Sequence, residues 1–177
     1  MKTKKITLCA ILVALALLLS LLERLIPLSY LFPLPGVKLG LSNLVTLFAL
    51  YCLGLPYAFT VLILRCVLGS IFGGSLTSLA YSLSGGILSL CISYLAKGTR
   101  FFSVYGVSIL GSAAHSIGQI LAASLLLGSM SAFGYLPVLL FVSILTGFLI
   151  GSLGALLIKN LSGILSLPSS GKEACRP

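Results

Sequence analysis

The chain is organised around the stretch Pro35-Gly36-Val37-Lys38-Leu39-Gly40-Leu41-Ser42-Asn43, which runs directly into the apolar residues 44–55. A basic segment rich in turn residues, followed at once by an apolar run, predicts a loop that ends at the mouth of a membrane helix. Lys38, Ser42 and Asn43 are expected at that mouth. This stretch is therefore the first place to look for a bound ligand.

The composition of the whole chain indicates the class of protein. Of the 177 residues, 59% are hydrophobic and only 7% are charged, whereas soluble domains carry about a quarter charged residues. The formal net charge is +9. The basic residues are scattered at the ends of apolar runs instead of gathering on one face, which argues against a nucleic-acid partner. We predict an integral membrane protein whose basic residues set its topology in the lipid bilayer.

Six apolar runs are expected to form the transmembrane helices of an all-α protein. Pro27, Pro33, Pro35 and Gly36 interrupt the chain after the first run, which predicts an irregular first outer loop and is compatible with a re-entrant one. The second run is short for a hydrocarbon core of about 30 Å, so its polar start is expected below the headgroups. We predict one membrane domain over residues 1–160 and a disordered tail over residues 161–177. The expected spans are residues 6–22, 41–53, 57–72, 76–96, 103–127 and 135–158.

The distribution of basic residues tests the count of six spans. With six spans, most basic residues fall on the side of the termini: Lys2, Lys4, Lys5, Lys97, Arg100, Lys159, Lys172 and Arg176. The loops on the other side carry only Lys38, with Arg24 close by. The positive-inside rule then predicts cytoplasmic N- and C-termini and an outward-facing stretch 35–43.

The scarcity of acidic residues argues against catalysis. The chain has no Asp, and its two acids are Glu23 and Glu173. This excludes a paired-carboxylate site and an Asp-rich diphosphate–magnesium site, and no Walker sequence or metal-ligand cluster occurs. No third residue is available to orient His115 as the base of a nucleophilic serine. We predict that the chain is not an enzyme and that it uses no metal or cofactor.

Arg65 is expected deep in the membrane. It follows Pro56 by nine residues, roughly 14 Å along a helix. An arginine near the bilayer centre costs about 2.5 to 3.5 kcal/mol on insertion scales, so it should face the protein interior or a watery cavity. Its partner is either the carboxylate of Glu23 or a ligand.

His115 and Gln119 are expected one helical turn apart near the middle of the fifth span. With Ser108 and Ser112 they form a polar stripe, and such a stripe must face protein or a cavity and not lipid. Ligand contact and hydrogen bonding between helices both explain it.

Charge counting suggests the kind of ligand. Arg24, Lys38 and Arg65 outnumber the single carboxylate of Glu23 among the outward and central positions. A cavity open to the outside would be net positive, which favours an anionic or amphipathic small solute.

Faces of small residues predict close contacts between helices. They are formed by Ala10 and Ala14, by Ser78, Ser82, Gly85 and Ser89, and by Gly147, Gly151 and Ala155. The first of these faces serves either packing within the chain or docking of a partner.

Three passages resemble a known family. They are PGVKLGLSNLVTLFALYCLG at residues 35–54, GGSLTSLAYSLSGGILS at residues 73–89 and AHSIGQ at residues 114–119. Over residues 6–159 the chain resembles the bacterial Gx transporter family, also labelled heptaprenyl diphosphate synthase component I. That family in turn resembles the substrate-binding S components of energy-coupling factor (ECF) vitamin transporters, which are six-helix proteins of similar size.

The resemblance implies two alternative functions. An S-component-like protein of the bacterial cytoplasmic membrane would bind a solute beneath a capping loop at residues 27–40. It would dock on a transmembrane coupling subunit through Ala10 and Ala14, and ATPases would supply the energy. The synthase label implies instead a non-catalytic membrane partner of a soluble prenyl diphosphate synthase. A standalone carrier is a third reading.

We expect the S-component-like function. In that reading the loop stretch forms the lid and rim of the site. The substrate-binding residues are then Lys38, Ser42, Asn43, Arg65, His115 and Gln119.

Overall fold

The computed structural model describes residues 2–25, 40–73, 76–99 and 101–164. Every regular element in these ranges is helical, and five helices are long and apolar enough to cross a membrane. The elements are α1 (Lys2–Leu25), α2 (Asn43–Cys52), α3 (Leu55–Gly73), α4 (Leu76–Gly98), α5 (Val104–Leu127), the 3₁₀ helix η2 (Met130–Tyr135) and α6 (Leu136–Ile164). The predicted fold class, an all-α membrane protein of six helices, is confirmed.

The second helix differs from the other five in its length. α2 has ten residues, which span about 15 Å at 1.5 Å per residue, or half of a hydrocarbon core of about 30 Å. Eight of its residues are buried, so it lies inside the bundle. Its first residue, Asn43, contacts Arg65 near the middle of α3. α2 therefore begins at mid-height in the bundle, as the short polar start of the second run predicts. The irregular outer loop predicted before it, residues 27–40, lies outside the described residues apart from Gly40.

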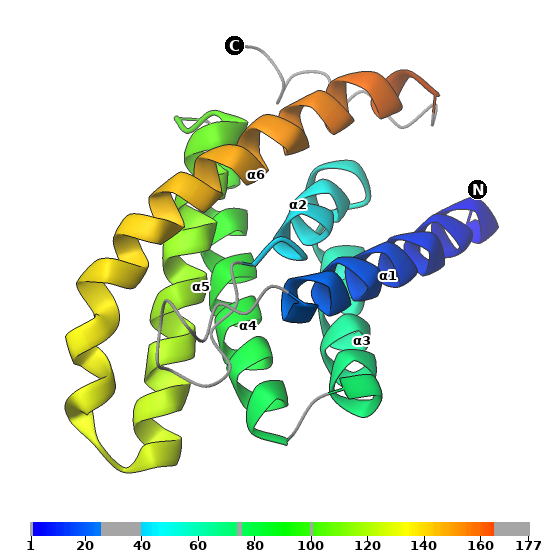
Figure 1. Cartoon of the computed structure of the whole chain (residues 1–177). Helices are drawn as coiled ribbons and strands as arrows, with labels where there is room; N and C mark the ends of the chain where they lie inside the picture. The colour runs from blue at the N-terminus through cyan, green and yellow to red at the C-terminus, as the bar shows by residue number, and fades with distance from the viewer. Residues whose placement is uncertain (1, 26–39, 74–75, 100, 165–177) are drawn as a thin grey trace.

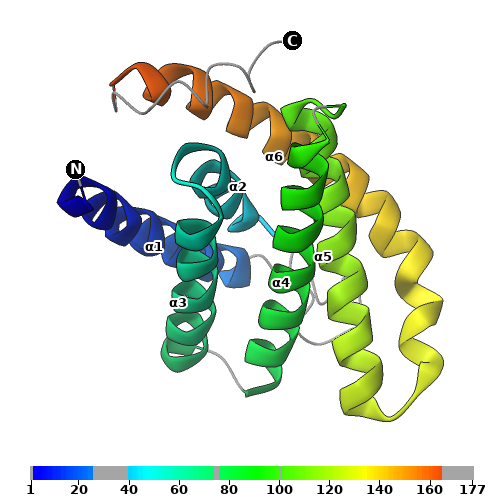
Figure 2. The same ribbon diagram turned by 180° about the vertical axis from the view of Figure 1, so that it is seen from behind.

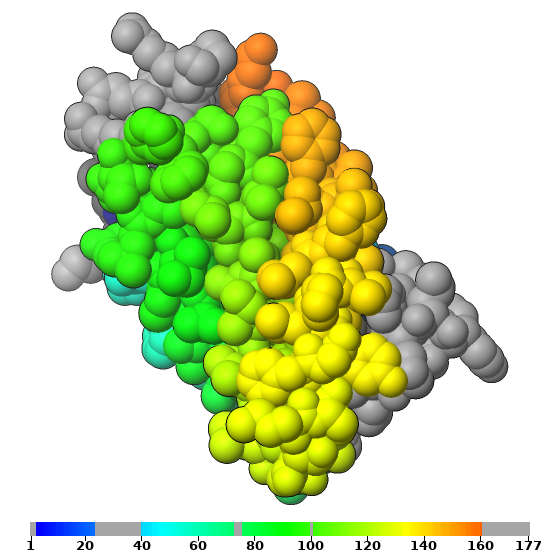
Figure 3. Space-filling model, turned by 90° about the vertical axis from the view of Figure 1, so that its left-hand side faces the viewer, coloured from blue at the N-terminus to red at the C-terminus, as the bar shows by residue number. Residues whose placement is uncertain are grey.

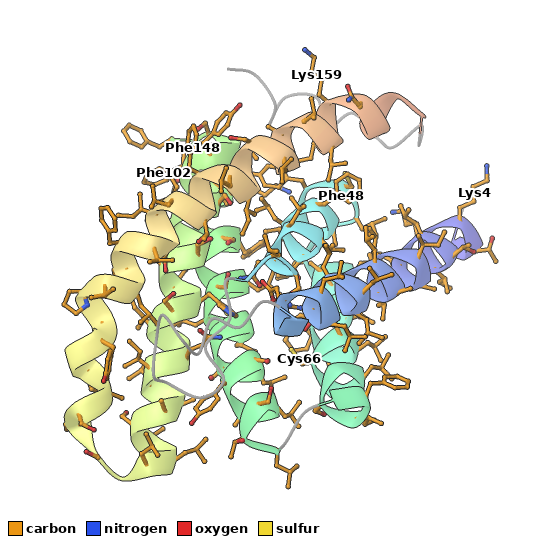
Figure 4. The ribbon with its side chains drawn as sticks, in the orientation of Figure 1. Lys4, Phe48, Cys66, Phe102, Phe148 and Lys159 are labelled. Carbon is orange, nitrogen blue, oxygen red and sulfur yellow. The ribbon has the colours of Figure 1, made fainter. Side chains whose placement is uncertain are left out.

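The two ends of the bundle can be told apart in Figures 1 and 2. One end carries the start of α1, the turn between α2 and α3, the connection from α4 to α5 and the end of α6. The other end carries the end of α3, the start of α4 and the connection from α5 to α6. Lys4 and Lys159 both point away from the bundle at the first end (Figure 4), which is called the basic end below.

α4, α5 and α6 form a layer in which glycines bring the helix backbones together. A Cβ added at Gly118 of α5 would lie 2.8 Å from the Cα of Gly85 in α4. One added at Gly147 of α6 would lie 2.7 Å from the Cα of Ile109 in α5. Both distances are too short for any side chain, so glycine is required for this approach. The small-residue faces predicted on α4 and α6 therefore pack on α5, and Figure 3 shows the three helices side by side.

α1 packs mainly against α3 and α2. One side of the helix is buried in these contacts, with Cys9, Leu12, Val13, Ala16, Ser20 and Glu23. Ala10 and Ala14 are exposed. The small-residue face predicted on this helix is therefore not used for packing among the described residues.

The C-terminal end of α2 is fixed by a lysine from α4. Leu53 and Gly54 donate backbone hydrogen bonds to the Ala49 carbonyl at 2.8 and 3.1 Å. The next carbonyl, that of Leu50, accepts a hydrogen bond from Lys97 Nζ at 2.9 Å. The same ammonium lies 4.6 Å from the centroid of the Tyr51 ring. Lys97 thus satisfies a carbonyl that the helix end leaves without an intrahelical partner.

The predicted boundaries differ most around α6. Residues 128–134, between the expected fifth and sixth spans, contain the start of a 3₁₀ helix at Met130, and α6 continues to Ile164 instead of ending at residue 158. Lys159 is exposed, so its charge does not stop the helix, and the next proline is Pro168.

Candidate functional site

A polar pocket lies between α1, α3, α4 and α5, in the half of the bundle away from the basic end. The centre of a water-sized sphere can occupy a volume of about 10 Å³ in this pocket. This is about the space that one water molecule needs. The lining residues are Ser20, Glu23, Gly40, Ser42, Arg65, Cys66, Gly69, Ser70, Ser78, Ser82 and His115. Cys66 marks its place on α3 (Figure 4). We call this cavity the Arg65 pocket.

Arg65 anchors the start of α2. Its side chain is buried, with 5% of its surface exposed. One Nη atom donates a hydrogen bond to Ser42 Oγ, and the other donates to Asn43 Oδ1 at 2.9 Å. Hydrogen bonds from a charged donor are worth about 1.5 to 3 kcal/mol each. These two partners were not among those predicted for Arg65. The available signal was that Ser42, Asn43 and Arg65 are all polar positions expected at depth in the membrane.

Glu23 holds the same segment from α1. Its side chain is 2% exposed, and its Oε1 accepts a hydrogen bond from the backbone N–H of Leu41. Glu23 also lines the Arg65 pocket. Two opposite charges therefore line one pocket, and both bind the chain where it enters α2.

Gly40 allows the backbone to turn sharply just before α2 begins. Its φ of +82° lies in the left-handed region, which glycine adopts at little cost. Its carbonyl accepts a hydrogen bond from the backbone N–H of Asn43 at 2.8 Å. A Cβ at this position would lie 2.9 Å from Asn43 Nδ2 and 3.6 Å from the His115 ring. The chain thus passes close to α5 as it turns into α2.

His115 and Gln119 occupy different surroundings although they lie one turn apart on α5. Both are buried, at 5% and 3% exposure. Both lie against Gly85 of α4, whose added Cβ would be 2.9 Å from His115 Nδ1 and 3.0 Å from Gln119 Cγ, but only His115 is among the residues that line the Arg65 pocket. Neither amide atom of Gln119 has a hydrogen-bond partner within the described part of the chain. The predicted stripe is therefore divided: His115 lines the Arg65 pocket, whereas Gln119 is not among its lining residues.

The predicted positive character of the site rests on side chains outside the described part of the chain. Lys38 and the side chain of Arg24 both fall there. Among the described lining residues, Arg65 and Glu23 carry opposite charges. The described pocket is thus polar and nearly balanced in formal charge.

A second polar pocket lies between α2, α4, α5 and α6, closer to the basic end. Its volume, measured in the same way, is about 20 Å³. It is lined by Asn43, Thr46, Leu47, Leu50, Gly86, Ser89, Leu90, Ser93, Ser108, Gly111, Ser112 and Ile150. We call it the serine pocket. Ser108 and Ser112 of the predicted stripe belong here, so the sequence indicated polar residues in this region but not a separate cavity.

These features define the class of protein: a multi-pass helical membrane protein with two polar pockets inside its bundle, one of them lined by a buried arginine and a buried glutamate. The model of the family described as heptaprenyl diphosphate synthase component I matches residues 12–157. The chain belongs to this family, as the three sequence passages predicted. A search of the curated proteins and a search of the solved structures each found no match. The further resemblance to ECF S components stays a prediction.

Proposed function

We propose that the protein binds a small anionic or amphipathic solute in the Arg65 pocket and delivers it across the membrane together with partner subunits. One observation carries the proposal. Arg65 is buried in the pocket lining, two of its nitrogens bond to α2, and its Nε has no partner among the described residues. This N–H is enclosed in the present conformation, and a ligand oxygen that reached it would form a charge-assisted hydrogen bond, which is a strong type.

The pocket volume favours a small solute or a small polar head group. A space for about one water cannot enclose a long isoprenoid chain in this conformation. A ligand larger than this would require the lining to move apart, and the segment 40–43 is held in the lining by the side chains of Glu23 and Arg65.

The proposed orientation follows the positive-inside rule. The basic end lies in the cytoplasm of a bacterial cell, and the Arg65 pocket then lies in the outer half of the cytoplasmic membrane. Solute would enter from outside.

The proposed partners supply the energy for transport. No nucleotide-binding sequence occurs in it, so the energy would come from ATPases that act through a transmembrane coupling subunit. Ala10 and Ala14 offer an exposed small-residue face on α1, which suits docking of another helix. We expect the coupling subunit to co-purify with the protein and to be lost in an Ala14→Leu variant.

The second candidate is a non-catalytic membrane partner of a soluble prenyl diphosphate synthase, and the name of the family favours it. A chain without Asp cannot form the Asp-rich magnesium site of such enzymes. This candidate predicts that a soluble synthase co-purifies in place of a coupling subunit, and that Ala14→Leu leaves the pairing intact.

Native mass spectrometry of the purified protein, with variants at two glycines, tests solute binding. A Cβ at Gly69 would lie 3.8 Å from Leu17 Cδ1 and 3.9 Å from Ser20 Oγ. Gly69→Ala therefore fits the fold while it adds a methyl group to the pocket lining. Gly98→Ala is the matched control, because no heavy atom lies within 4 Å of its added Cβ.

We expect wild type and Gly98→Ala to retain a ligand whose mass shows a carboxylate or phosphate group. Gly69→Ala should retain about tenfold less, which corresponds to about 1.4 kcal/mol of binding free energy. Equal retention in all three proteins, or no ligand in any of them, would contradict binding in the Arg65 pocket.

A further inference from the structure

The Arg65 pocket has one acidic and one basic side chain buried in the same lining. Glu23 is 2% exposed and Arg65 is 5% exposed, both line the cavity, and Glu23 attracts Arg65 electrostatically. The sequence has eleven Lys and Arg residues but only two acids, and the second acid, Glu173, lies near the C-terminus. A strongly basic chain thus places its one acid before the tail in the same pocket as a buried arginine.

Stability alone does not explain this pair of charges. The attraction between two buried ions often does not repay the loss of their hydration, and apolar side chains of similar volume are often at least as stable. Electrostatic complementarity contributes more to the specificity of a binding site than to raw affinity. Glu23 and Arg65 are therefore better explained by the charge of the ligand that the pocket selects.

Glu23 disfavours a ligand that carries only negative charge. Charges interact strongly in the protein interior, where the effective dielectric constant is lower than in water, so the carboxylate of Glu23 repels a simple anion. A cationic group on the same ligand turns this repulsion into attraction, while the anionic group still pairs with Arg65. The pocket therefore favours a ligand with one charge of each sign.

The two buried side chains hold neighbouring residues, which limits the spacing of the charges on such a ligand. Glu23 accepts a hydrogen bond from the Leu41 N–H, and Arg65 donates to Ser42 and Asn43. Consecutive Cα atoms are about 3.8 Å apart, so Glu23 and Arg65 act on one short stretch of chain. A ligand that takes over these bonds needs its donor and its acceptor only a few covalent bonds apart.

We propose that the solute of the Arg65 pocket is a small zwitterion, whose carboxylate or phosphate pairs with Arg65 and whose ammonium group pairs with Glu23. Glu23 determines the specificity, because its carboxylate attracts the ammonium group and repels a simple anion. By taking both partners at once, the ligand releases the segment 41–43 from both side chains. This inference rests on the proposed binding of a solute in the Arg65 pocket and narrows the class of that solute.

Three small probes test the charge of the ligand: glycine, sodium acetate and methylammonium chloride, at constant ionic strength. Glycine combines the carboxylate of acetate with the ammonium group of methylammonium. The measurements are made at about pH 8, where an imidazole such as that of His115 is normally neutral. We expect glycine to raise the Tm of the wild-type protein in detergent, with a Kd about tenfold lower than that of either other probe. An equal or lower Kd for acetate, or no shift with glycine, would overturn the inference.

Glu23→Gln tests the residue that sets this preference. Glutamine keeps an oxygen that can accept the Leu41 N–H, so the segment remains held while the negative charge is lost. We expect the preference for glycine over acetate to fall about tenfold. Lys4→Gln is the control, because it also removes one charge, from an exposed lysine, and it should keep the wild-type preference. An unchanged preference in Glu23→Gln would overturn the role of Glu23, and if this variant does not fold, the order of the probes on the wild type still decides.

The outcomes separate the zwitterion from solute binding itself. Tighter binding of acetate than of glycine leaves an anionic solute in the pocket and overturns the zwitterion alone. If no probe shifts the Tm and native mass spectrometry finds no retained ligand, solute binding in the Arg65 pocket is contradicted as well. Gly69→Ala adds a methyl group to the pocket lining and should weaken glycine binding about tenfold. Equal glycine affinity in Gly69→Ala and wild type would place the glycine site elsewhere and would also overturn the inference.

Discussion

The two halves of the bundle are held together by different interactions. α4, α5 and α6 meet through glycines such as Gly118 and Gly147, whose added Cβ atoms would collide with backbone. α1, α2 and α3 meet at a segment bound by two buried charges, Glu23 on Leu41 and Arg65 on Ser42 and Asn43. The Arg65 pocket lies where these halves face each other.

The two kinds of contact restrict movement of the helices to different degrees. In lipid no hydrophobic force drives helices together, so backbone contact and hydrogen bonds decide their association. Glycine contacts have one close-packed arrangement and resist any added atom. The hydrogen bonds of Glu23 and Arg65 can in principle form with other partners. We therefore expect the α4–α6 half to be the more rigid side of the pocket and the entry to α2 to be the side that adjusts to a ligand.

The largest loss of stability is expected for Arg65→Met, which removes hydrogen bonds between α3 and the start of α2. It removes two charge-assisted hydrogen bonds and leaves Ser42, Asn43 and Glu23 without this neighbour, so we expect a loss of about 3 kcal/mol in unfolding free energy. Arg65→Lys keeps the charge but cannot form both bonds in the same geometry. Its stability should lie between those of wild type and Arg65→Met. Thermal unfolding in detergent measures both. Equal Tm values for Arg65→Met and wild type would show that this half does not depend on the arginine.

Gly118→Ala disturbs the close contact between α4 and α5 and should cause the next largest loss of stability. Its Cβ would lie 2.8 Å from Gly85 Cα and 2.8 Å from the Ser84 carbonyl oxygen, and overpacking of this kind costs about 1 to 3 kcal/mol. Gly134→Ala is the control, because no heavy atom lies within 4 Å of its added Cβ. The Tm should fall for Gly118→Ala alone. A similar Tm for the two variants would mean that α4 and α5 can separate freely.

Lys97→Met should cause the smallest loss of stability. It tests the contacts at the C-terminal end of α2. It removes the cap on the Leu50 carbonyl and the contact with the Tyr51 ring, each worth about 0.5 to 1 kcal/mol, while the apolar stem is kept. Lys4→Met is the control on an exposed lysine. We expect a Tm decrease of about 2 to 4 °C per kcal/mol lost, seen for Lys97→Met only. Equal changes in both would point to a loss of surface charge instead of a loss of the cap.

The order of the helices and their close-packing faces could be predicted because these signals are local. Apolar runs determine the membrane helices, and glycines at helical spacing determine which faces can approach. The sequence also predicted that the second run is short, but residues 41–53 were expected to form a membrane span, whereas α2 has ten residues and is not among the five helices long enough to cross. The continuation of α6 past Lys159 was not predictable, because one exposed charge resembles a helix end in sequence.

The candidate site was predictable as a set of residues but not as an arrangement. Arg65 bonds to side chains 22 and 23 positions away, and no local pattern relates these positions. His115 and Gln119 both lie against Gly85 of another helix, yet only His115 lines the Arg65 pocket, and no pattern within α5 indicates this difference. The serine pocket needs four helices to meet, so its residues looked like ordinary small packing faces.

The length of α6 has a consequence for the behaviour of the protein in lipid. Its 29 residues measure about 43 Å, whereas the hydrocarbon core is about 30 Å thick, so the helix must tilt or project beyond it. Gly154 of α6 packs on α2, with its added Cβ 3.2 Å from Leu47. A thinner bilayer increases the tilt of a long helix, and we expect this contact to transmit the tilt to the helix that carries Asn43. The geometry of the Arg65 pocket is then expected to respond to bilayer thickness.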